Sequence, residues 1–76
     1  MFDLQNGKGY ELRLWDGVLL VDAYQNSEGK WTLIEIDFDF EGPLQFEVAD
    51  DGAILDVNEE IPESTGATVR DLRLLK

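Results

Sequence analysis

Acidic side chains recur at every second position over one short stretch of the sequence. They are Glu35, Asp37, Asp39 and Glu41, within the segment Trp31–Glu41. Carboxylates grouped in this way can bind a hard cation, work as an acid–base pair, or present negative charge to a partner. Each of these functions needs a different geometry, and the sequence distinguishes between them.

Calcium binding is the first of these functions. The residues from Asp37 to Gly42 match the opening of an EF-hand loop, with oxygen ligands at its first, third and fifth positions and glycine at its sixth. The match then ends, because Pro43 comes seventh and Val48 stands where the loop needs a bidentate glutamate. An extended strand also keeps successive carboxylates on one face about 6.5–7 Å apart, too far for one ion to bind three of them. We therefore expect no metal site and no cofactor in this chain.

Catalysis is the second function, and the composition removes most of its common forms. The sequence contains no histidine and no cysteine, which excludes zinc sites of the usual kind, Ser-His-Asp triads and imidazole acid–base chemistry. A carboxylate pair can hydrolyse a glycoside only in a cleft that desolvates one acid while the other stays ionised. A chain of 76 residues folded as a small sheet offers little concave volume. We therefore predict a protein that is not an enzyme and has no catalytic residues.

The net charge is −11, from 17 acidic and 6 basic residues, and it is confined to one part of the chain. The segment 31–69 holds eleven acids and no lysine or arginine, whereas the remainder holds six residues of each sign and is neutral. Such a field repels nucleic acids and anionic membranes and attracts basic proteins. The sequence thus predicts a basic protein partner, with no direct binding of nucleic acid and no membrane contact.

Two interpretations of the acidic row remain open. In the first, the charges keep the protein soluble and prevent its sheet from pairing with other chains. In the second, Glu35, Asp37, Asp39 and Glu41 form a partner-binding face, and their spacing of about 6.5–7 Å along a strand imitates consecutive phosphates. The second interpretation predicts a non-catalytic interaction module that acts as a nucleic-acid mimic toward a basic protein.

Aromatic residues favour an alternative function. On the expected strands Trp15, Tyr24 and Trp31 share the face opposite the core, with Tyr24 paired to Trp31 across a four-residue loop. Exposed tryptophan and tyrosine are typical anchors of protein interfaces. The alternative is a structural domain that forms a homodimer through this aromatic face, with its charge serving solubility alone.

The elements that position these residues follow from the hydrophobic pattern. The segment Trp31–Glu41 has the strict alternation of a strand with one buried and one wet face, and its even-numbered apolar residues are expected to face the core. Before it, Tyr10–Trp15 and Val18–Tyr24 are expected to form a hairpin around a two-residue turn at Asp16-Gly17. A less regular strand is expected at Phe2–Gln5, ahead of a bulge.

Further hairpins are expected after the central strand. A loop at Glu41–Pro43 pairs Phe38 with Phe46, and a two-residue turn at Asp51-Gly52 pairs Val48 with Leu55. Residues 58–66 have the composition of a loop. Residues 67–76 fit a strand or a short helix, and a strand that extends or closes the sheet is favoured because a helix of ten residues is marginal.

These elements predict an all-β fold, a small antiparallel meander of five or six strands curled into a barrel or half-barrel, with the C-terminal segment as a further strand or short helix. Residues 1–76 are expected to form a single small β domain. No apolar run approaches the roughly 20 residues of a membrane span, and the absence of cysteine suits the reducing cytoplasm. The expected core consists of Tyr10, Leu12, Leu14, Leu19, Val21, Ile34, Ile36, Phe38, Phe40, Leu44, Phe46, Val48, Leu55 and Val57.

Overall fold

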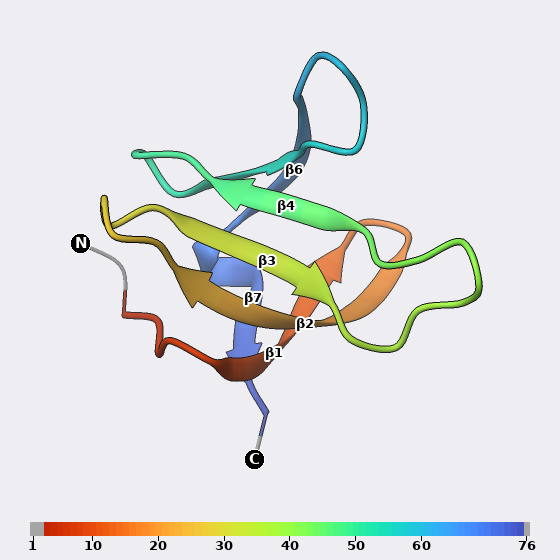
Figure 1. The fold of residues 1–76 in the computed structure, drawn as a ribbon, viewed down its shortest axis with the longest axis horizontal. Coiled ribbons are helices and arrows are strands. Elements are labelled where there is room, and N and C mark those ends of the chain that lie inside the picture. Colours follow the sequence, from red (N-terminus) through yellow and green to blue (C-terminus); the bar gives the residue numbers. More distant parts are fainter. Residues whose placement is uncertain (1–2, 76) are drawn as a thin grey trace.

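The computed structural model describes residues 3–75, which form one antiparallel sheet of seven strands (Figure 1). The strands lie in the order β6-β5-β4-β3-β2-β1-β7. A single turn of 3-10 helix, η1, separates the last two strands. The elements are β1 (Lys8–Leu14), β2 (Gly17–Gln25), β3 (Trp31–Glu35), β4 (Gln45–Val48), β5 (Ala53–Asp56), β6 (Glu63–Thr68), η1 (Val69–Asp71) and β7 (Leu72–Leu74).

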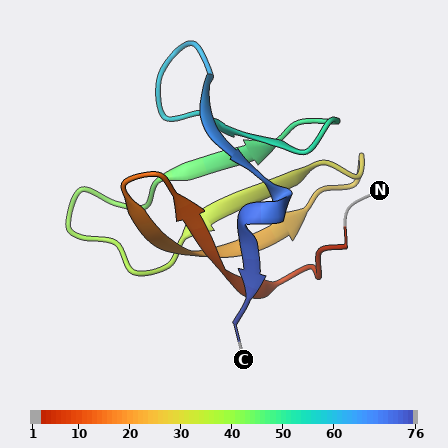
Figure 2. The same cartoon turned by 180° about the vertical axis from the view of Figure 1, so that it is seen from behind.

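The sheet curls into a half-barrel whose first six strands form a meander. Figure 2, seen from behind, shows the chain running from β6 through η1 to β7 in front of the layer of β2, β3 and β4. Strand β7 then pairs with β1 on the side away from β2, so that it becomes an edge of the sheet. The predicted all-β, antiparallel, half-barrel architecture is confirmed, with seven strands instead of five or six and with a strand at the C-terminal end.

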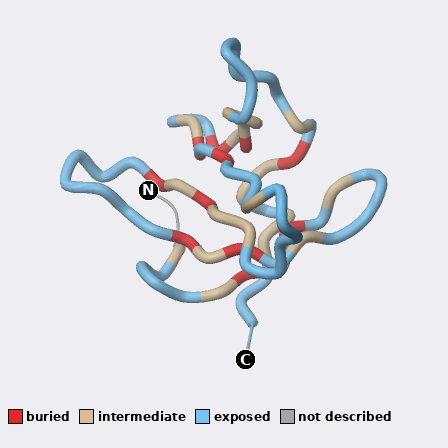
Figure 3. Tube along the Cα trace, turned by 45° about the vertical axis from the view of Figure 1, so that its right-hand side comes forward, coloured by how far each residue is buried: buried red, intermediate tan, exposed pale blue. Residues whose placement is uncertain are grey.

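The core lies on the inner face of the curled sheet, and buried positions follow the strands while the loops are exposed (Figure 3). Removing this apolar surface from water is the main term that stabilises the fold. Partly buried Leu4, Leu14, Leu19, Val69 and Leu72 pack against the core. Its buried residues are Tyr10, Leu12, Val21, Ala23, Trp31, Leu33, Phe46, Val48, Ile54 and Ala67.

The first hairpin has the predicted strands and the predicted inner face, but its register differs by two residues. Leu12 pairs with Leu19, and Leu14 with Gly17, so the turn residues are Trp15 and Asp16. A shift by two residues keeps every side chain on its own face. The predicted core residues of β1 and β2 therefore stay buried or partly buried although their partners change.

The loop between β2 and β3 has five residues where we expected four. Asn26 stabilises this length, because its backbone N–H donates to the Lys30 carbonyl at 2.9 Å. Its side-chain Oδ1 accepts from the N–H groups of Glu28 and Lys30, both at 2.9 Å. Gly29 completes the turn with a φ of 85°, which a residue with a side chain rarely adopts.

The additional loop residue inverts the inner face of β3. Tyr24 now pairs with Thr32 and Gln25 with Trp31. Because strand side chains alternate, Leu33 becomes fully buried and Trp31 is 6% exposed. The prediction that Ile34 and its even-numbered neighbours form the core side of this strand is wrong for that reason.

The central strand is also shorter than predicted, because it ends at Glu35. The ladder to β4 closes with the Glu35 N–H donating to the Leu44 carbonyl at 2.9 Å, and Pro43 has no N–H with which to extend it. Residues 36–44 form a loop, which we call the β3–β4 loop. Four apolar residues assigned to the core are consequently exposed: Ile36, Phe38, Phe40 and Leu44.

A loop of different length also reverses β5. The turn after β4 contains three residues instead of two, since the Ala49 N–H donates to the Ala53 carbonyl at 2.8 Å. Ile54 therefore points inward and is fully buried, whereas Leu55 and Val57, both predicted core residues, are only half-buried.

Two further expectations are corrected at the edges of the sheet. The region expected as a loop contains β6, which is fixed to β5 by the Thr65 hydroxyl donating to the Ile54 carbonyl at 2.7 Å. Residues 3–5 form no strand, and Phe2 of the expected first strand lies outside the described residues. Leu4 instead packs against the core from the side.

Candidate protein-binding surface

The four acidic residues singled out in the sequence lie together in the structure. Glu35, Asp37, Asp39 and Glu41 line one open hollow of about 500 Å³, together with Gly42, Pro43, Leu44 and Asn58. Only Glu35 belongs to a strand, and the other three lie on the β3–β4 loop. The four carboxylates therefore form a cluster around a loop instead of a straight row along a strand.

Two of the four carboxylates hold the loop in shape. The Asp39 Oδ1 accepts the Glu41 N–H at 3.0 Å, and the Asp39 carbonyl accepts the Gly42 N–H at 3.0 Å. The Glu35 Oε1 accepts the Leu44 N–H at 3.2 Å at the base of the loop. Substitution of Asp37 and Glu41 removes charge without touching these bonds, which separates the electrostatic role of the cluster from its structural one.

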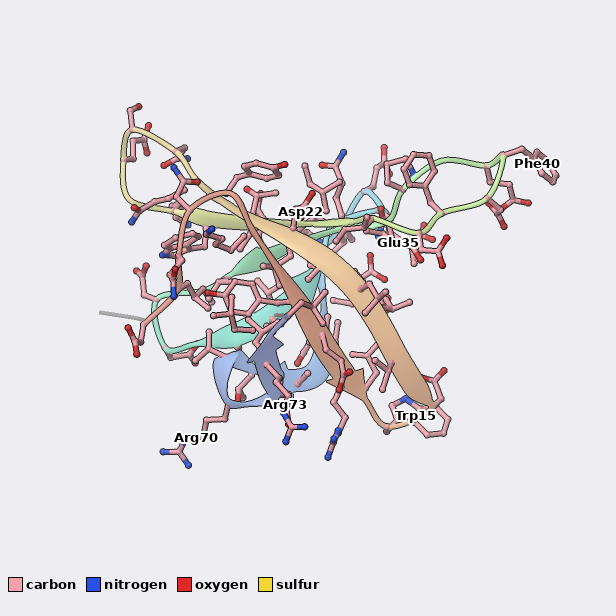
Figure 4. The ribbon with its side chains drawn as sticks, turned by 90° about the horizontal axis from the view of Figure 1, so that it is seen from below. Trp15, Asp22, Glu35, Phe40, Arg70 and Arg73 are labelled. Carbon is pink, nitrogen blue, oxygen red and sulfur yellow. The ribbon has the colours of Figure 1, made fainter. Side chains whose placement is uncertain are left out.

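The tip of the loop carries an exposed aromatic side chain. Phe40 is 97% exposed and extends away from the body of the protein (Figure 4). Phe38 and Ile36 on the same loop are about half as exposed as Phe40. The sequence pattern assigned all three to the core, so the apolar part of this surface was missed.

Asn58 is a second component that the sequence did not reveal. Its side-chain Oδ1 accepts the Gln45 N–H at 3.0 Å, and its Nδ2 donates to the Gln45 carbonyl at 3.1 Å. The same Nδ2 donates to Asp56 at 2.6 Å. This amide fixes the start of β4 beside the hollow, a contact across 13 residues of sequence for which the local pattern gives no signal.

The three aromatic residues predicted to form one dimer face are separated. Trp15 is 91% exposed in the turn between β1 and β2, and Tyr24 is 43% exposed near the opposite end of β2. Trp31 is buried in the core, because the five-residue loop turned it inward. The expected shared face is therefore absent.

Tyr24 lies beside a carboxylate on the outer face of the sheet. Its hydroxyl donates to the Asp22 Oδ2 at 3.3 Å. The negative charge of Asp22 raises the pKa of Tyr24 above its ordinary value of 10.0, with smaller contributions from desolvation and from the hydrogen bond.

Basic side chains gather on the opposite side of the protein from the loop tip. Arg13 of β1, Arg70 of η1 and Arg73 of β7 line one hollow of about 130 Å³, together with Glu11, Asp71 and Leu72. Figure 4 shows Arg70 and Arg73 on one side and Phe40 on the other. The charge asymmetry of the sequence is thus also an asymmetry in space.

Comparison with protein-family models, with curated proteins and with solved structures finds no match. Within residues 3–75, no group of three or more acidic residues is arranged to hold a metal ion. In the same part of the chain, no helix has the length and hydropathy to cross a membrane.

Proposed function

We propose that the protein is a non-catalytic interaction module that binds a basic protein through the β3–β4 loop. The observation that carries this proposal is Phe40, nearly fully exposed at the tip of a loop that also bears Asp37, Asp39 and Glu41. The carboxylates steer a cationic partner by long-range attraction, and the aromatic ring supplies buried apolar area on contact.

A role in solubility alone explains the charge but not the phenylalanine. Solubilising surfaces are rich in mixed charges and poor in exposed aromatic residues. Here Ile36, Phe38 and Phe40 alternate with acids on one loop, and all are exposed. Apolar residues grouped within a charged rim are typical of a contact surface.

The expected partner surface is basic and contains an apolar pocket that accepts a phenylalanine ring. A nucleic-acid-binding groove meets the first requirement, and mimicry of nucleic acid is the narrower form of this proposal. A competition experiment separates mimicry of nucleic acid from binding to another kind of basic surface. A short DNA duplex should displace the protein from a nucleic-acid-binding groove, whereas it should not displace the protein from a basic partner of another kind. We place the interaction in the cytoplasm, since a chain without cysteine has no need of an oxidising compartment.

Capture of partners from a lysate of the producing cells tests the proposal. Wild-type protein on a solid support should retain a basic protein that elutes as salt rises. Phe40→Ser, and separately Asp37→Asn with Glu41→Gln, should reduce its recovery at least tenfold. The matched control changes Glu59 and Glu60 to Gln, which removes the same charge from another exposed loop and should leave recovery unchanged. Equal recovery by all four proteins would refute binding through the loop.

The homodimer alternative now depends on Trp15, whose exposure is unusual for a tryptophan. It predicts self-association that salt does not weaken and that Trp15→Ala abolishes. Sedimentation of the wild-type protein and of Trp15→Ala across a salt series measures both properties.

A further inference from the structure

The sheet has an open edge at β7. Among residues 3–75, this three-residue strand pairs with β1 on one side and with no strand on the other. The Leu75 N–H donates to the Gly9 carbonyl at 3.0 Å, which fixes the phase of the antiparallel ladder. Because hydrogen-bonding directions alternate, the peptide groups of Arg73 face β1 and those of Leu74 face outward. An unpaired edge of this kind is a template for a strand from another chain.

The surface beside this edge is apolar along one part and cationic along the next. A hollow of about 330 Å³ is lined by Leu4, Val69, Leu72 and Leu74 as well as by Asp3, Gln5, Tyr10 and Arg70. Arg70 also borders the neighbouring hollow, where Arg13 and Arg73 lie with Glu11 and Asp71, so that three arginines outnumber two carboxylates. A strand added to β7 would therefore meet backbone hydrogen-bonding groups, leucine side chains and arginines together.

One segment of this same chain has the matching pattern. The sequence Ile36–Glu41 alternates apolar and acidic residues as a half-buried strand does, yet it leaves the sheet at Glu35. When such a segment is extended, its phenylalanines lie on one face and its carboxylates on the other. The phenylalanines then match Leu72 and Leu74 of the 330 Å³ hollow beside β7. The carboxylates match Arg70 of that hollow and Arg73 of the neighbouring one.

We propose that the β3–β4 loop of one copy adds as a strand to the β7 edge of a second copy. The inference rests on the proposed function, because it uses the same loop as the binding segment and identifies one surface with exposed arginines that the loop fits. On binding, the turn bond from the Gly42 N–H to the Asp39 carbonyl is exchanged for hydrogen bonds to the outward peptide groups of β7.

Position requires the contact to be between copies, and charge permits it. Phe40 and Arg70 extend to opposite sides of the protein in Figure 4, so a loop cannot reach the edge of its own chain. The net charge does not prevent the contact, since the arginines of the accepting surface belong to the part of the sequence that is neutral. An acidic region therefore meets a neutral region with exposed arginines.

The stoichiometry follows from the geometry. Each copy has one donating loop and one accepting edge, and these are different surfaces, so the contact is heterologous. Wild-type protein should extend beyond a dimer as its concentration rises. A copy that has lost either surface can occupy only the end of an assembly.

Sedimentation equilibrium across protein concentration tests this arrangement. The loop variant combines Asp37→Asn with Phe38→Asn, and the edge variant is Leu74→Pro, which removes an outward N–H where a sheet edge tolerates proline. A second edge variant, Arg70→Gln with Arg73→Gln, covers the case in which Leu74→Pro does not fold. Each variant alone should remain a monomer, and an equimolar mixture of a loop variant with an edge variant should stop at a dimer. The control replaces Lys8 and Lys30 with Gln, which removes the same charge elsewhere, and should assemble like the wild type.

A wild-type protein that stays monomeric, a loop or edge variant that assembles as the wild type does, or a mixture that stays monomeric would overturn the inference. The proposed function fails by a different result. Arg70→Gln with Arg73→Gln leaves the loop intact, so it should still capture the basic partner from a lysate even where self-association is lost. If capture of the basic partner depends on Phe40 but the wild-type protein does not self-associate, only the inference about β7 is refuted.

Discussion

Strand β1 and the β3–β4 loop have the same alternation of apolar and charged residues but opposite environments. Tyr10, Leu12 and Leu14 of β1 face the core, between β2 and β7. Phe38 and Phe40 of the loop are exposed beyond the end of the β3–β4 ladder. Alternation therefore indicates that a segment can form a strand with two different faces, and hydrogen-bonded neighbours on both sides decide whether the apolar face is buried.

The largest effect on the free energy of unfolding is expected for a residue of the core, and a residue of the loop serves as its comparison. Leu33→Ala should lower the free energy of unfolding by about 2–5 kcal/mol, because it leaves a cavity in a fully buried site. Phe40→Ala removes a larger side chain but should change the stability by less than about 0.5 kcal/mol, since nothing covers that ring. Urea unfolding of the two variants measures both values. Similar destabilisation by the two substitutions would mean that the loop packs on the protein.

An intermediate effect is expected at the turn that sets the face of β3. Asn26→Ala removes the side-chain oxygen that accepts two backbone N–H groups, and it should lower the free energy of unfolding by about 1–2 kcal/mol. Ser27→Ala, at the neighbouring exposed position, is the control and should be nearly neutral. Thermal unfolding of both variants makes the comparison. An equal loss in the two variants would show that the Asn26 contacts do not stabilise this turn.

The smallest expected effect concerns ionisation on the outer face of the sheet. Asp22→Asn should lower the pKa of Tyr24 toward 10.0, because the neighbouring negative charge is the main cause of its upward shift. A group whose pKa is raised on folding makes its full contribution to stability at pH values below its pKa in the unfolded chain. That contribution is lost as the pH rises through the folded pKa, so the effect appears only in alkaline solution. Ultraviolet titration of tyrosinate measures the shift, and an unchanged titration curve would remove Asp22 as its cause.

The fold class could be predicted from the sequence, but the inward-facing residues of the later strands could not. The first hairpin has its predicted inner face because the predicted register was wrong by two residues, an even number. One additional residue in the loop at Asn26, and one at Gly52, each exchanged the two faces of the next strand. Those loop lengths depend on hydrogen bonds and on glycine conformations that a pattern of apolar residues does not contain.

The candidate site was predicted in part. The four carboxylates were identified and lie together, because they fall within one short segment and the β3–β4 loop turns back through the bond from the Gly42 N–H to the Asp39 carbonyl. The phenylalanines between them were assigned to the core, since exposure of Phe40 follows from the absence of a neighbouring strand, which is a long-range property. Strand β6 was missed for a related reason: its small polar residues carry little pattern, and a contact from Thr65 to the distant Ile54 fixes it in place.

Site-specific photocrosslinking from position 40 tests the central claim most directly. A photoreactive phenylalanine analogue replaces Phe40 in cells that make the protein, and the same analogue at Tyr24 serves as the control on another exposed aromatic position. The account predicts that a basic protein is crosslinked from position 40, that high salt before illumination removes the product, and that position 24 gives no such product. Absence of a crosslink from position 40, or the same product from both positions, would contradict binding through the β3–β4 loop.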